Sequence, residues 1–317
     1  MRTAMNEFKL PYNFLQKLKA LYPERFEAVE KTFLEKKHTT FRVNCLKTDL
    51  GSLRQMLRHN YISFSELDYP EGTFLLKTSL RQFQNSDIYR RGLVSIQNVS
   101  SMLPVIALAP ASGEAILDLC AAPGIKTAHL ASCATEAEIV AIEKVRKRYY
   151  KLQAYLSYQG ANNVKTLLLD SSWVRKKYPD YFDKILADVP CSAEARFLVS
   201  NPLTYKYWSE YKVREMEHKQ RKLLHAAFFA LKEGGTLLYS TCAFSPEENE
   251  CVINWFLNRF KDKVELLPLD YPCQNAVDGL KRWKDEEFCA DMQYTKRIIP
   301  DAVFEGFFIA KIKKLSD

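Results

Sequence analysis

The fold is decided by Asp118-Leu119-Cys120-Ala121-Ala122-Pro123-Gly124-Ile125-Lys126-Thr127, which directly follows the apolar residues Ala115-Ile116-Leu117. A buried strand here enters a loop of small residues, and a helix leaves it. An open α/β sheet binds a nucleotide-like ligand at such a place, beyond the carboxyl end of a strand, where small side chains let the backbone approach the ligand. The GxxxxGK[ST] spacing is absent, so this is not a phosphate-binding loop.

The same pattern continues from about residue 100 onward, where short apolar runs alternate with amphipathic stretches. The strand candidates are Ala115–Leu119, Glu138–Ile142, Val164–Leu169, Lys184–Ala187, Thr236–Tyr239 and Gly306–Ile312. The helix candidates are residues 125–133, 145–158, 209–232 and 246–260. Short buried runs separated by amphipathic helices predict an α/β domain with a parallel sheet covered on both faces, which we place at residues 97–317.

The N-terminal third has a different pattern. Apolar residues recur at helical spacing through about residues 14–34, and a second helix is expected after the capping residues Thr48 and Asp49. The strand candidates here are Thr40–Asn44, Ile62–Ser65 and Thr73–Leu76. The resulting β-α-β-β order predicts a small α+β domain over residues 1–96, somewhat like an RNA-recognition fold.

Charge is distributed unevenly along the 317 residues. Lys and Arg number 46 and Asp and Glu 38, a net charge of +8. Residues 1–100 hold 16 basic and 10 acidic side chains, whereas residues 101–317 hold 30 and 28. A basic N-terminal third indicates contact with a polyanion such as nucleic acid, or a lysine-coated surface.

Acidic residues end the second and third strands of the α/β pattern. Glu143 follows Asp118 by 25 residues, a position where a carboxylate suits the two hydroxyls of a ribose. Asp170 ends the third strand, where it could accept a hydrogen bond from an exocyclic amine. Each carboxylate alone reads as a helix cap, but three at successive strand ends favour adenosine binding.

Two of the eight cysteines follow the fourth and fifth strands. Cys191 lies in the motif Asp188–Ser192 and Cys242 in the motif Ser240–Glu250. Because these strands are normally adjacent, we expect the two thiols side by side over the adenosine site. A predicted helix start just after Cys242 favours its thiolate, and a thiolate beside an acid suits attack on an electron-poor ring carbon. The alternative is two buried thiols without chemistry.

Several classes of protein are disfavoured. No CxxC pair occurs and the five histidines lack metal-ligand spacing, so we expect no metal. The longest apolar stretch, near Met102–Ala111, contains two prolines and is too short to span a bilayer. Met1–Leu10 lacks the apolar core of a secretory signal. The sequence therefore predicts a soluble, cytoplasmic protein with free thiols, and nothing demands more than a monomer.

The motifs together resemble the NOL1/NOP2/Sun family of RNA cytosine-5 methyltransferases, which includes the bacterial ribosomal-RNA cytosine methylases. The matching segments are Phe41–Asn44, Gln97–Ser101, Asp118–Thr127, Asp188–Ser192, Ser240–Glu250 and Gly306–Lys311. They run in the family's order over nearly the whole chain. The resemblance implies a class I S-adenosylmethionine-dependent, Rossmann-like methyltransferase domain that acts on a cytosine in ribosomal or transfer RNA.

The resemblance also implies a role for individual residues. Cys242 matches the nucleophile that adds to C6 of cytosine, and Asp188 matches the acid that holds N3 and the exocyclic amine. Cys191 matches the residue that assists proton loss from C5 and enzyme release, and Lys126 matches a lysine near the base. The matching contacts of S-adenosylmethionine are Cys120, Ala121, Ala122, Pro123, Gly124, Ile125, Lys126, Glu143, Asp170 and Asp188.

Basic residues divide into two groups. Arg42, Arg90 and Arg91 are expected to touch RNA phosphates, given the charge of the N-terminal third. Most of the basic cluster at residues 144–151 is expected to be a solvated helix face. After Cys191 many family members read Ser-Gly-Thr-Gly, whereas this chain has Ser192-Ala193-Glu194-Ala195, which weakens any inference about target choice.

Two other functions compete with RNA cytosine methylation. A catalytically idle RNA-binding assembly factor would have decayed motifs, yet Asp188, Cys191 and Cys242 are all present. A DNA cytosine methyltransferase would take its nucleophile from the motif after strand four, whereas here a second cysteine follows strand five.

Overall fold

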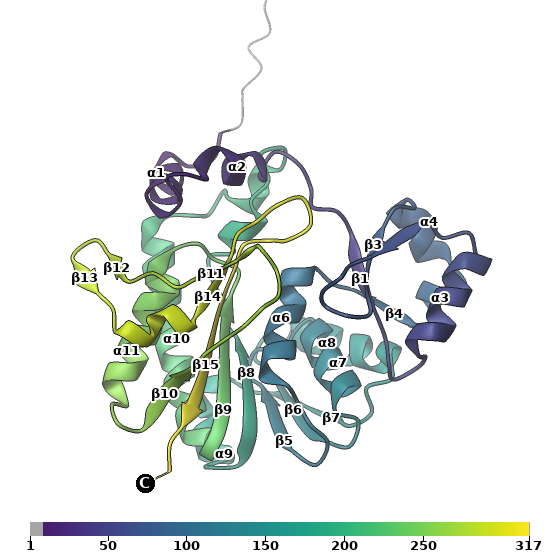
Figure 1. Cartoon of the computed structure of the whole chain (residues 1–317). Coiled ribbons are helices and arrows are strands. Elements are labelled where there is room, and N and C mark those ends of the chain that lie inside the picture. Colours follow the sequence, from purple (N-terminus) through teal and green to yellow (C-terminus); the bar gives the residue numbers. More distant parts are fainter. Residues whose placement is uncertain (1–8, 317) are drawn as a thin grey trace, which may run out of the picture.

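The computed structural model of the chain describes residues 9–316, which form a four-stranded sheet, a nine-stranded sheet and a two-stranded hairpin (Figure 1). The large sheet has the order β11-β14-β15-β9-β8-β5-β6-β7, with β10 paired to β15. Its strands are β5 (Ala115–Asp118), β6 (Glu138–Glu143), β7 (Val164–Leu168), β8 (Phe182–Asp188), β9 (Leu231–Thr241), β10 (Val264–Leu267), β11 (Ala276–Asp278), β14 (Lys296–Ile298) and β15 (Phe307–Lys314).

The five strands from β7 to β9 are parallel, and β15 lies antiparallel to β9. All six strands predicted in this part of the sequence therefore form. The chain runs from β5 outward to β6 and β7 and then returns to β8 on the other side of β5. This reversal is the topological switch point, and it places a crevice beyond the carboxyl ends of β5 and β8.

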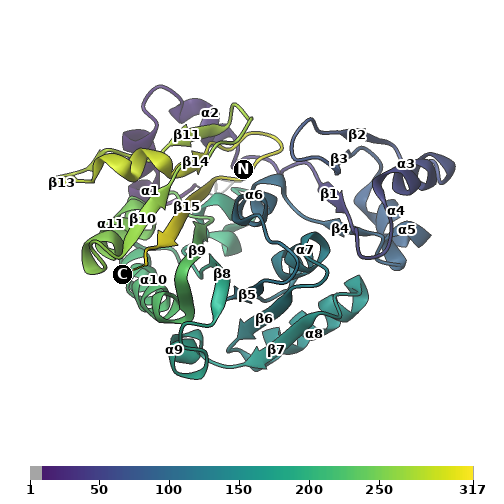
Figure 2. The same cartoon turned by 60° about the horizontal axis from the view of Figure 1, so that its bottom comes forward.

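Helices cover both faces of the large sheet (Figure 2). They are α6 (Val99–Leu108), α7 (Ile125–Cys133), α8 (Arg146–Gln159), α9 (Val174–Lys177), α10 (Glu210–Ala230) and α11 (Glu250–Arg259). Neighbouring residues of one strand face opposite layers: Ile116 packs in the core with α6, α7 and α8, whereas Leu117 packs in the core with α10 and α11. This alternation confirms the prediction of a sheet buried on both sides. Within residues 9–316, no helix is long and apolar enough to cross a membrane.

The small sheet has the antiparallel order β2-β3-β1-β4 and its own apolar core. Its elements are β1 (Thr40–Val43), α3 (Leu50–His59), β2 (Phe64–Glu66), β3 (Thr73–Leu76), α4 (Leu80–Asn85), α5 (Asp87–Arg90) and β4 (Val94–Ile96). The predicted β-α-β-β order is present, and Asp49 caps α3 by accepting from the Ser52 amide. The sequence did not predict α4, α5 or β4, which have six, four and three residues and show no period. Strands β2 and β3 are equally short, but the turn residues Pro70-Glu71-Gly72 lie between them and mark both.

The first two helices pack away from the small sheet. Helices α1 (Tyr12–Leu21) and α2 (Phe26–Lys31) share a core with the large sheet. The Phe14 ring lies 4.9 Å from that of Phe197, and Lys17 Nζ donates to Ser245 Oγ at 3.0 Å. The boundary between residues 96 and 97 stays a prediction, but α1 and α2 contact the larger part of the molecule (Figure 1).

The region after β9 departs most from the prediction. A helix was expected at residues 246–260, and the chain forms one turn of 3-10 helix, η4 (Pro246–Glu248), before α11. The remaining short elements are β12 (Arg282–Trp283), β13 (Glu286–Glu287), η1 (Ser171–Trp173), η2 (Glu194–Arg196), η3 (Pro202–Thr204) and η5 (Ala290–Tyr294).

Strand β14 carries Arg297, which is 2% exposed and forms a bidentate ion pair with Glu250. Arg297 also donates to the Phe244 carbonyl at 2.9 Å.

Replacing Arg297 by Met should lower the free energy of unfolding by about 3–5 kcal/mol, because the buried carboxylate of Glu250 is left unpaired. Arg54→Met is the matched control: Arg54 forms a bidentate pair with Glu66, but the two side chains are 39% and 38% exposed. Its loss should cost less than about 1 kcal/mol. Urea denaturation followed by circular dichroism measures both values, and equal losses would contradict this account.

Candidate active site

The loops after β5, β8 and β9 surround one hollow of about 400 Å³. The predicted residues that line it are Cys120, Ala121, Ala122, Pro123, Ile125, Lys126, Asp188, Cys191 and Cys242. An adjoining hollow of about 320 Å³ shares Cys120 and has Glu143 and Asp170 on its wall. The structure therefore brings together the residues that the sequence placed at successive strand ends.

The loop after β5 is shaped by Gly124, whose φ of +111° disfavours any side chain. Its amide donates to the Ala121 carbonyl at 2.8 Å, and α7 starts at the next residue. Gly124 thus shapes the loop without lining the hollow. Thr127 Oγ1 donates to Asp118 Oδ2 at 2.7 Å, and burial raises the pKa of Asp118 to about 7.

Asp188 lies at the carboxyl end of β8 with both carboxylate oxygens hydrogen-bonded. Lys126 Nζ donates to Oδ2 at 2.8 Å and Ser240 Oγ to Oδ1 at 2.9 Å. The Lys126 ammonium also lies 5.3 Å from the centre of the Phe307 ring. These contacts from α7, β9 and β15 fix the carboxylate at the wall of the hollow, where 29% of the side chain stays exposed.

The two cysteines are in contact, with 3.3 Å between Cys191 Sγ and Cys242 Sγ. The hydrogen bond that Cys191 donates lowers the pKa of Cys242, and the positive charge of Arg196 acts in the same direction against burial. The same hydrogen bond and burial raise the pKa of Cys191. The contact therefore shifts the pKa values of the two thiols in opposite directions, downward at Cys242 and upward at Cys191. The predicted cause was a helix start after Cys242, but only the single turn η4 begins there.

Glu194 holds the two cysteine loops together. Its side chain is fully buried and accepts four hydrogen bonds: from Trp208 Nε1 at 2.8 Å, Phe244 N at 2.7 Å, Ser245 N at 2.8 Å and Ser245 Oγ at 2.6 Å. The following amide, of Ala195, donates to the Cys242 carbonyl at 3.1 Å. The segment that departs from the common family pattern thus clamps the backbone around Cys242.

The Glu-Asn-Glu end of the third motif has a structural role. Glu248 Oε2 accepts from Ser192 N at 2.9 Å and from Gln220 Nε2 at 2.8 Å, and burial raises the pKa of Glu248 to about 8. Asn249 bonds both the Thr241 hydroxyl and the Ala243 carbonyl. Together with the ion pair of Glu250, these bonds fix the loop on either side of Cys242.

The second hollow holds the two other carboxylates. Glu143 is 4% exposed; its Oε1 accepts from the Val145 amide at 2.8 Å, and its Oε2 lies 3.4 Å from Arg148 Nη1. Asp170 caps η1 by accepting from the Ser172 amide at 3.0 Å. The alternative role of this carboxylate as a helix cap is therefore present in the structure. Burial acts to raise the pKa of Asp170, but the bonds from Ser172 and the charge of Lys144 lower it overall.

The three arginines expected to touch RNA lie in different settings. Arg42 is only 4% exposed and donates to Gln97 Oε1 at 3.0 Å and to Ser132 Oγ at 3.3 Å. It joins the small sheet to the end of α7, so its position does not fit a phosphate contact. Arg90 and Arg91 are exposed, and Arg91 pairs with Asp87 at 3.4 Å.

Two functional candidates were missed by sequence reasoning. Arg196 lines the first hollow, and Arg148 lines both hollows and donates to the Ala122 carbonyl at 2.7 Å. No spacing pattern distinguishes Arg148 from its basic neighbours on α8. Arg148 lies one turn before Leu152 on the same face of α8, and Leu152 packs beside the loop at Gly124. This shared helical face is the pattern that could have indicated that Arg148 lies near the loop.

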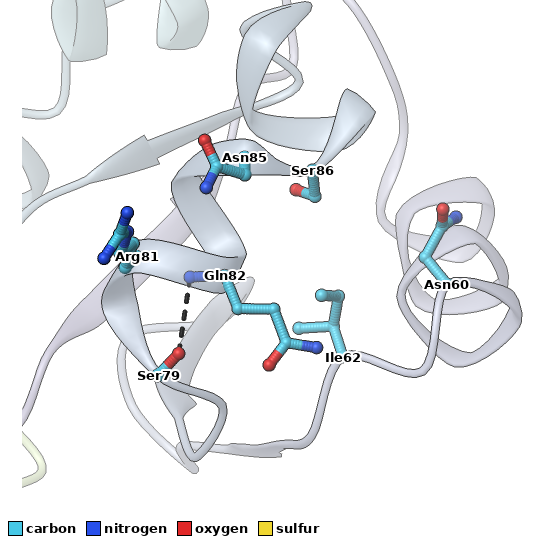
Figure 3. Close-up of a pocket in the computed structure, with 7 residues that line it drawn as sticks. All are labelled: Asn60, Ile62, Ser79, Arg81, Gln82, Asn85 and Ser86. Atoms are coloured by element: carbon cyan, nitrogen blue, oxygen red, sulfur yellow. Dashed lines mark hydrogen bonds between the residues drawn. The ribbon is translucent and has the colours of Figure 1, made fainter.

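A more voluminous hollow of about 520 Å³ lies on the small sheet, between the end of α3 and helix α4. Figure 3 shows its lining: Asn60, Ile62, Ser79, Arg81, Gln82, Asn85 and Ser86. It holds no carboxylate, thiol or imidazole beside its single arginine, so its size does not make it the active site. Across residues 9–316 no group of three or more His, Cys, Asp or Glu side chains is arranged to hold a metal ion.

The strand order, the antiparallel final strand and the two hollows at the switch point define the class I methyltransferase fold. A family model described as 16S rRNA methyltransferase RsmB/F matches residues 105–313. The chain belongs to this family, which confirms the resemblance to NOL1/NOP2/Sun proteins.

Relatives and solved structures agree with this assignment. The ribosomal RNA small subunit methyltransferase F of Escherichia coli O127:H6 (strain E2348/69 / EPEC) is 34% identical over 285 residues, 87% of this chain and 57% of that protein. The tRNA (cytosine(49)-C(5))-methyltransferase of Pyrococcus abyssi (strain GE5 / Orsay) is 32% identical over 278 residues, 87% of this chain and 88% of that protein. The crystal structure of a methyltransferase homolog protein from Pyrococcus horikoshii is similar with a TM-score of 0.81 and 31% identity, over 96% of this chain and 100% of that one. The chain thus spans little more than half the length of the Escherichia coli relative.

Asp118→Asn should change how stability depends on pH. The pKa of Asp118 rises from 3.8 to about 7 on folding, so the folded state holds this proton more tightly and loses stability as pH rises towards 7. Relative to wild type, the variant should gain roughly 2–3 kcal/mol between about pH 5 and about pH 8. Thermal unfolding at several pH values measures the difference.

Asp183→Asn is the control for this measurement. Burial acts to raise the pKa of Asp183, but the bond from Lys232 lowers it overall, so this carboxylate is ionised in both states over the same range. Its difference from wild type should stay constant. If the difference between Asp118→Asn and wild type is also independent of pH, the pKa of Asp118 is not raised by burial.

Proposed function

We propose that the protein is an RNA cytosine-C5 methyltransferase that uses S-adenosylmethionine. The observation that carries the proposal is the contact of two thiols beside the Lys126–Asp188 pair, in a hollow that adjoins a second one with two carboxylates. The printed names of the relatives, one acting on small-subunit ribosomal RNA and one on C5 of a tRNA cytosine, support it. The substrate is ribosomal or transfer RNA, and an RNA substrate agrees with the predicted cytoplasmic location.

The residues of the second hollow fit the adenosine part of S-adenosylmethionine, and the small-residue loop at Cys120–Lys126 fits its methionine part. Glu143 is buried and faces a counter-charge from Arg148, so a carboxylate is held ready to accept from ribose hydroxyls. When bound, S-adenosylmethionine supplies the methyl group but does not accept the proton that C5 of the base must lose. Proton movement therefore falls to side chains of the chain itself.

The two thiols divide the work on the base. The Cys242 thiolate adds to C6 and forms the S–C6 bond, which makes C5 nucleophilic. Asp188, fixed by Lys126 and Ser240, holds N3 and the exocyclic amine. When Cys242 is consumed in the adduct, Cys191 loses the acceptor that raised its pKa. Cys191 can then release its own proton to water, and the resulting thiolate takes the proton from C5 while the S–C6 bond breaks and returns the Cys242 thiolate.

The alternatives fit the site less well. An idle assembly factor gives no reason for two thiols to be in contact beside the Lys126–Asp188 pair. A DNA enzyme with its nucleophile at Cys191 gives no reason for a second thiol, that of Cys242, at 3.3 Å from it. A base paired in a helix could not reach the hollow, so the target cytosine lies in a loop or is flipped out.

Cofactor binding can be tested with carboxylates at the two ends of β6. Glu143→Gln should weaken S-adenosylmethionine binding about tenfold, which corresponds to about 1.4 kcal/mol, because a charged acceptor for the ribose is lost. Asp170→Ala should also weaken it. Glu138→Gln, at the opposite end of the strand, should leave affinity unchanged. Calorimetry measures all three, and an unchanged affinity of Glu143→Gln would remove this residue from the site.

The cysteine roles can be separated by covalent trapping. Cys242→Ala cannot form the adduct, so it should neither methylate nor trap RNA. Cys191→Ala retains the nucleophile and should transfer the methyl group and then stall, giving a protein–RNA band on a denaturing gel. Cys289→Ala, an exposed cysteine outside the hollow, should behave as wild type. Trapping by Cys242→Ala alone would exchange the two roles, and full activity in both variants would defeat the proposed chemistry.

A further inference from the structure

A third hollow shares a wall with the thiol hollow. It has a volume of about 360 Å³ and lies between the segment joining α2 to β1 and the loop after β8. Arg196 lines both hollows. The volume falls within the range of about 300–1,000 Å³ that is typical of small-ligand sites.

Arg196 is both fixed and available. Its neighbours Glu194 and Ala195 are buried and hydrogen-bonded to the loop of Cys242. These bonds fix the position of the Arg196 backbone relative to the two thiols. The Arg196 side chain is 60% exposed, and its nearest carboxylate oxygen, on Glu305, is 3.9 Å away. A guanidinium in this setting has donors free for a bidentate contact, which suits phosphate.

The opposite wall of the hollow carries three basic residues, Lys36, Lys37 and His38, beside one acidic residue, Glu35. Lys36 and His38 are exposed, and Lys37 is half-buried and donates to the Asp301 carbonyl at 2.5 Å. Burial lowers the pKa of Lys37 to about 8 despite the charges of Asp301 and Glu305. Because burial disfavours the charged form, an anion bound in the hollow would stabilise the Lys37 ammonium.

The floor between these walls is partly apolar. Phe197 and Ala195 are buried there and Ile96 is half-buried. Apolar surface between basic walls matches a nucleotide, whose base offers a π-face and whose backbone carries the charge.

We propose that this hollow binds the RNA nucleotide next to the target cytosine and that Arg196 binds the phosphate between the two. A strand whose base enters the thiol hollow must leave over its rim, and the rim at Arg196 leads directly into the third hollow. The inference rests on the proposed function, because it takes the target base to lie beside Cys191 and Cys242.

RNA binding, rather than activity, is the appropriate first measurement, because Arg196 also affects the pKa of Cys242. The probe is a short fluorescent single-stranded RNA with one central cytosine, titrated at several KCl concentrations. Arg196→Met and Lys36→Met should each weaken binding several-fold and reduce the slope of log affinity against log salt by about 0.7. Lys261→Met, an exposed lysine beyond the end of α11, should change neither.

A modified probe identifies the phosphate. Replacing the phosphate on one side of the cytosine by a neutral methylphosphonate should weaken binding to wild type but weaken Arg196→Met no further. Additive losses for both neighbouring phosphates would overturn the role of Arg196. Lys36→Met should also raise KM for RNA and leave kcat unchanged, because Lys36 does not line the thiol hollow.

The two proposals fail in different ways. Normal cytosine methylation with unchanged RNA affinity and salt slope in both variants would overturn the third hollow alone. Loss of affinity in both variants with no methyl transfer to cytosine by the wild-type protein would overturn the proposed function and, with it, the placement beside a target cytosine, and would leave only RNA binding at the third hollow. Circular dichroism and thermal unfolding show whether each variant is folded.

Discussion

The buried carboxylate of Glu194 is the interaction on which the site depends. A charge fully removed from water is tolerated only when its oxygens are bonded, and here two amides, a hydroxyl and an indole supply four donors. Three of these donors belong to Phe244 and Ser245, just after Cys242. The carboxylate therefore sets how closely the loop after β8 approaches the loop after β9. The 3.3 Å contact of the thiols and the position of Arg196 both follow from this distance.

The predictable part of the site is the part fixed by strand order. Asp118, Asp188 and Cys242 each follow a buried strand, and adjacency of parallel strands is enough to bring such residues together. Glu194, Arg148 and Arg196 were not predicted as functional, because their roles depend on which loop folds over them rather than on their own spacing. Arg42 was predicted to be functional, yet its side chain is buried against α7. Alternation predicts a strand at Phe41–Asn44 but does not show which face of that strand α7 covers.

The same limit explains the helices at the start of the chain. Apolar spacing predicts that residues near Phe14 and Leu18 bury one face, but the pattern is silent about the partner. In the folded chain the partner is the loop after β9, since Phe14, Phe33 and Tyr22 surround the Phe244 ring. Strands β10 to β14, of two to four residues, carry too little sequence for a period to show.

The loop that carries Cys242 is tied to distant parts of the chain. Lys17, from α1, bonds Ser245, and Arg297, from β14, bonds the Phe244 carbonyl. One of these two residues lies near the start of the described chain and the other near its end, so the loop takes its folded shape only after both regions have packed against the large sheet. Ribosomal synthesis therefore supplies the last of these bonds after every strand from β5 to β9 has been made.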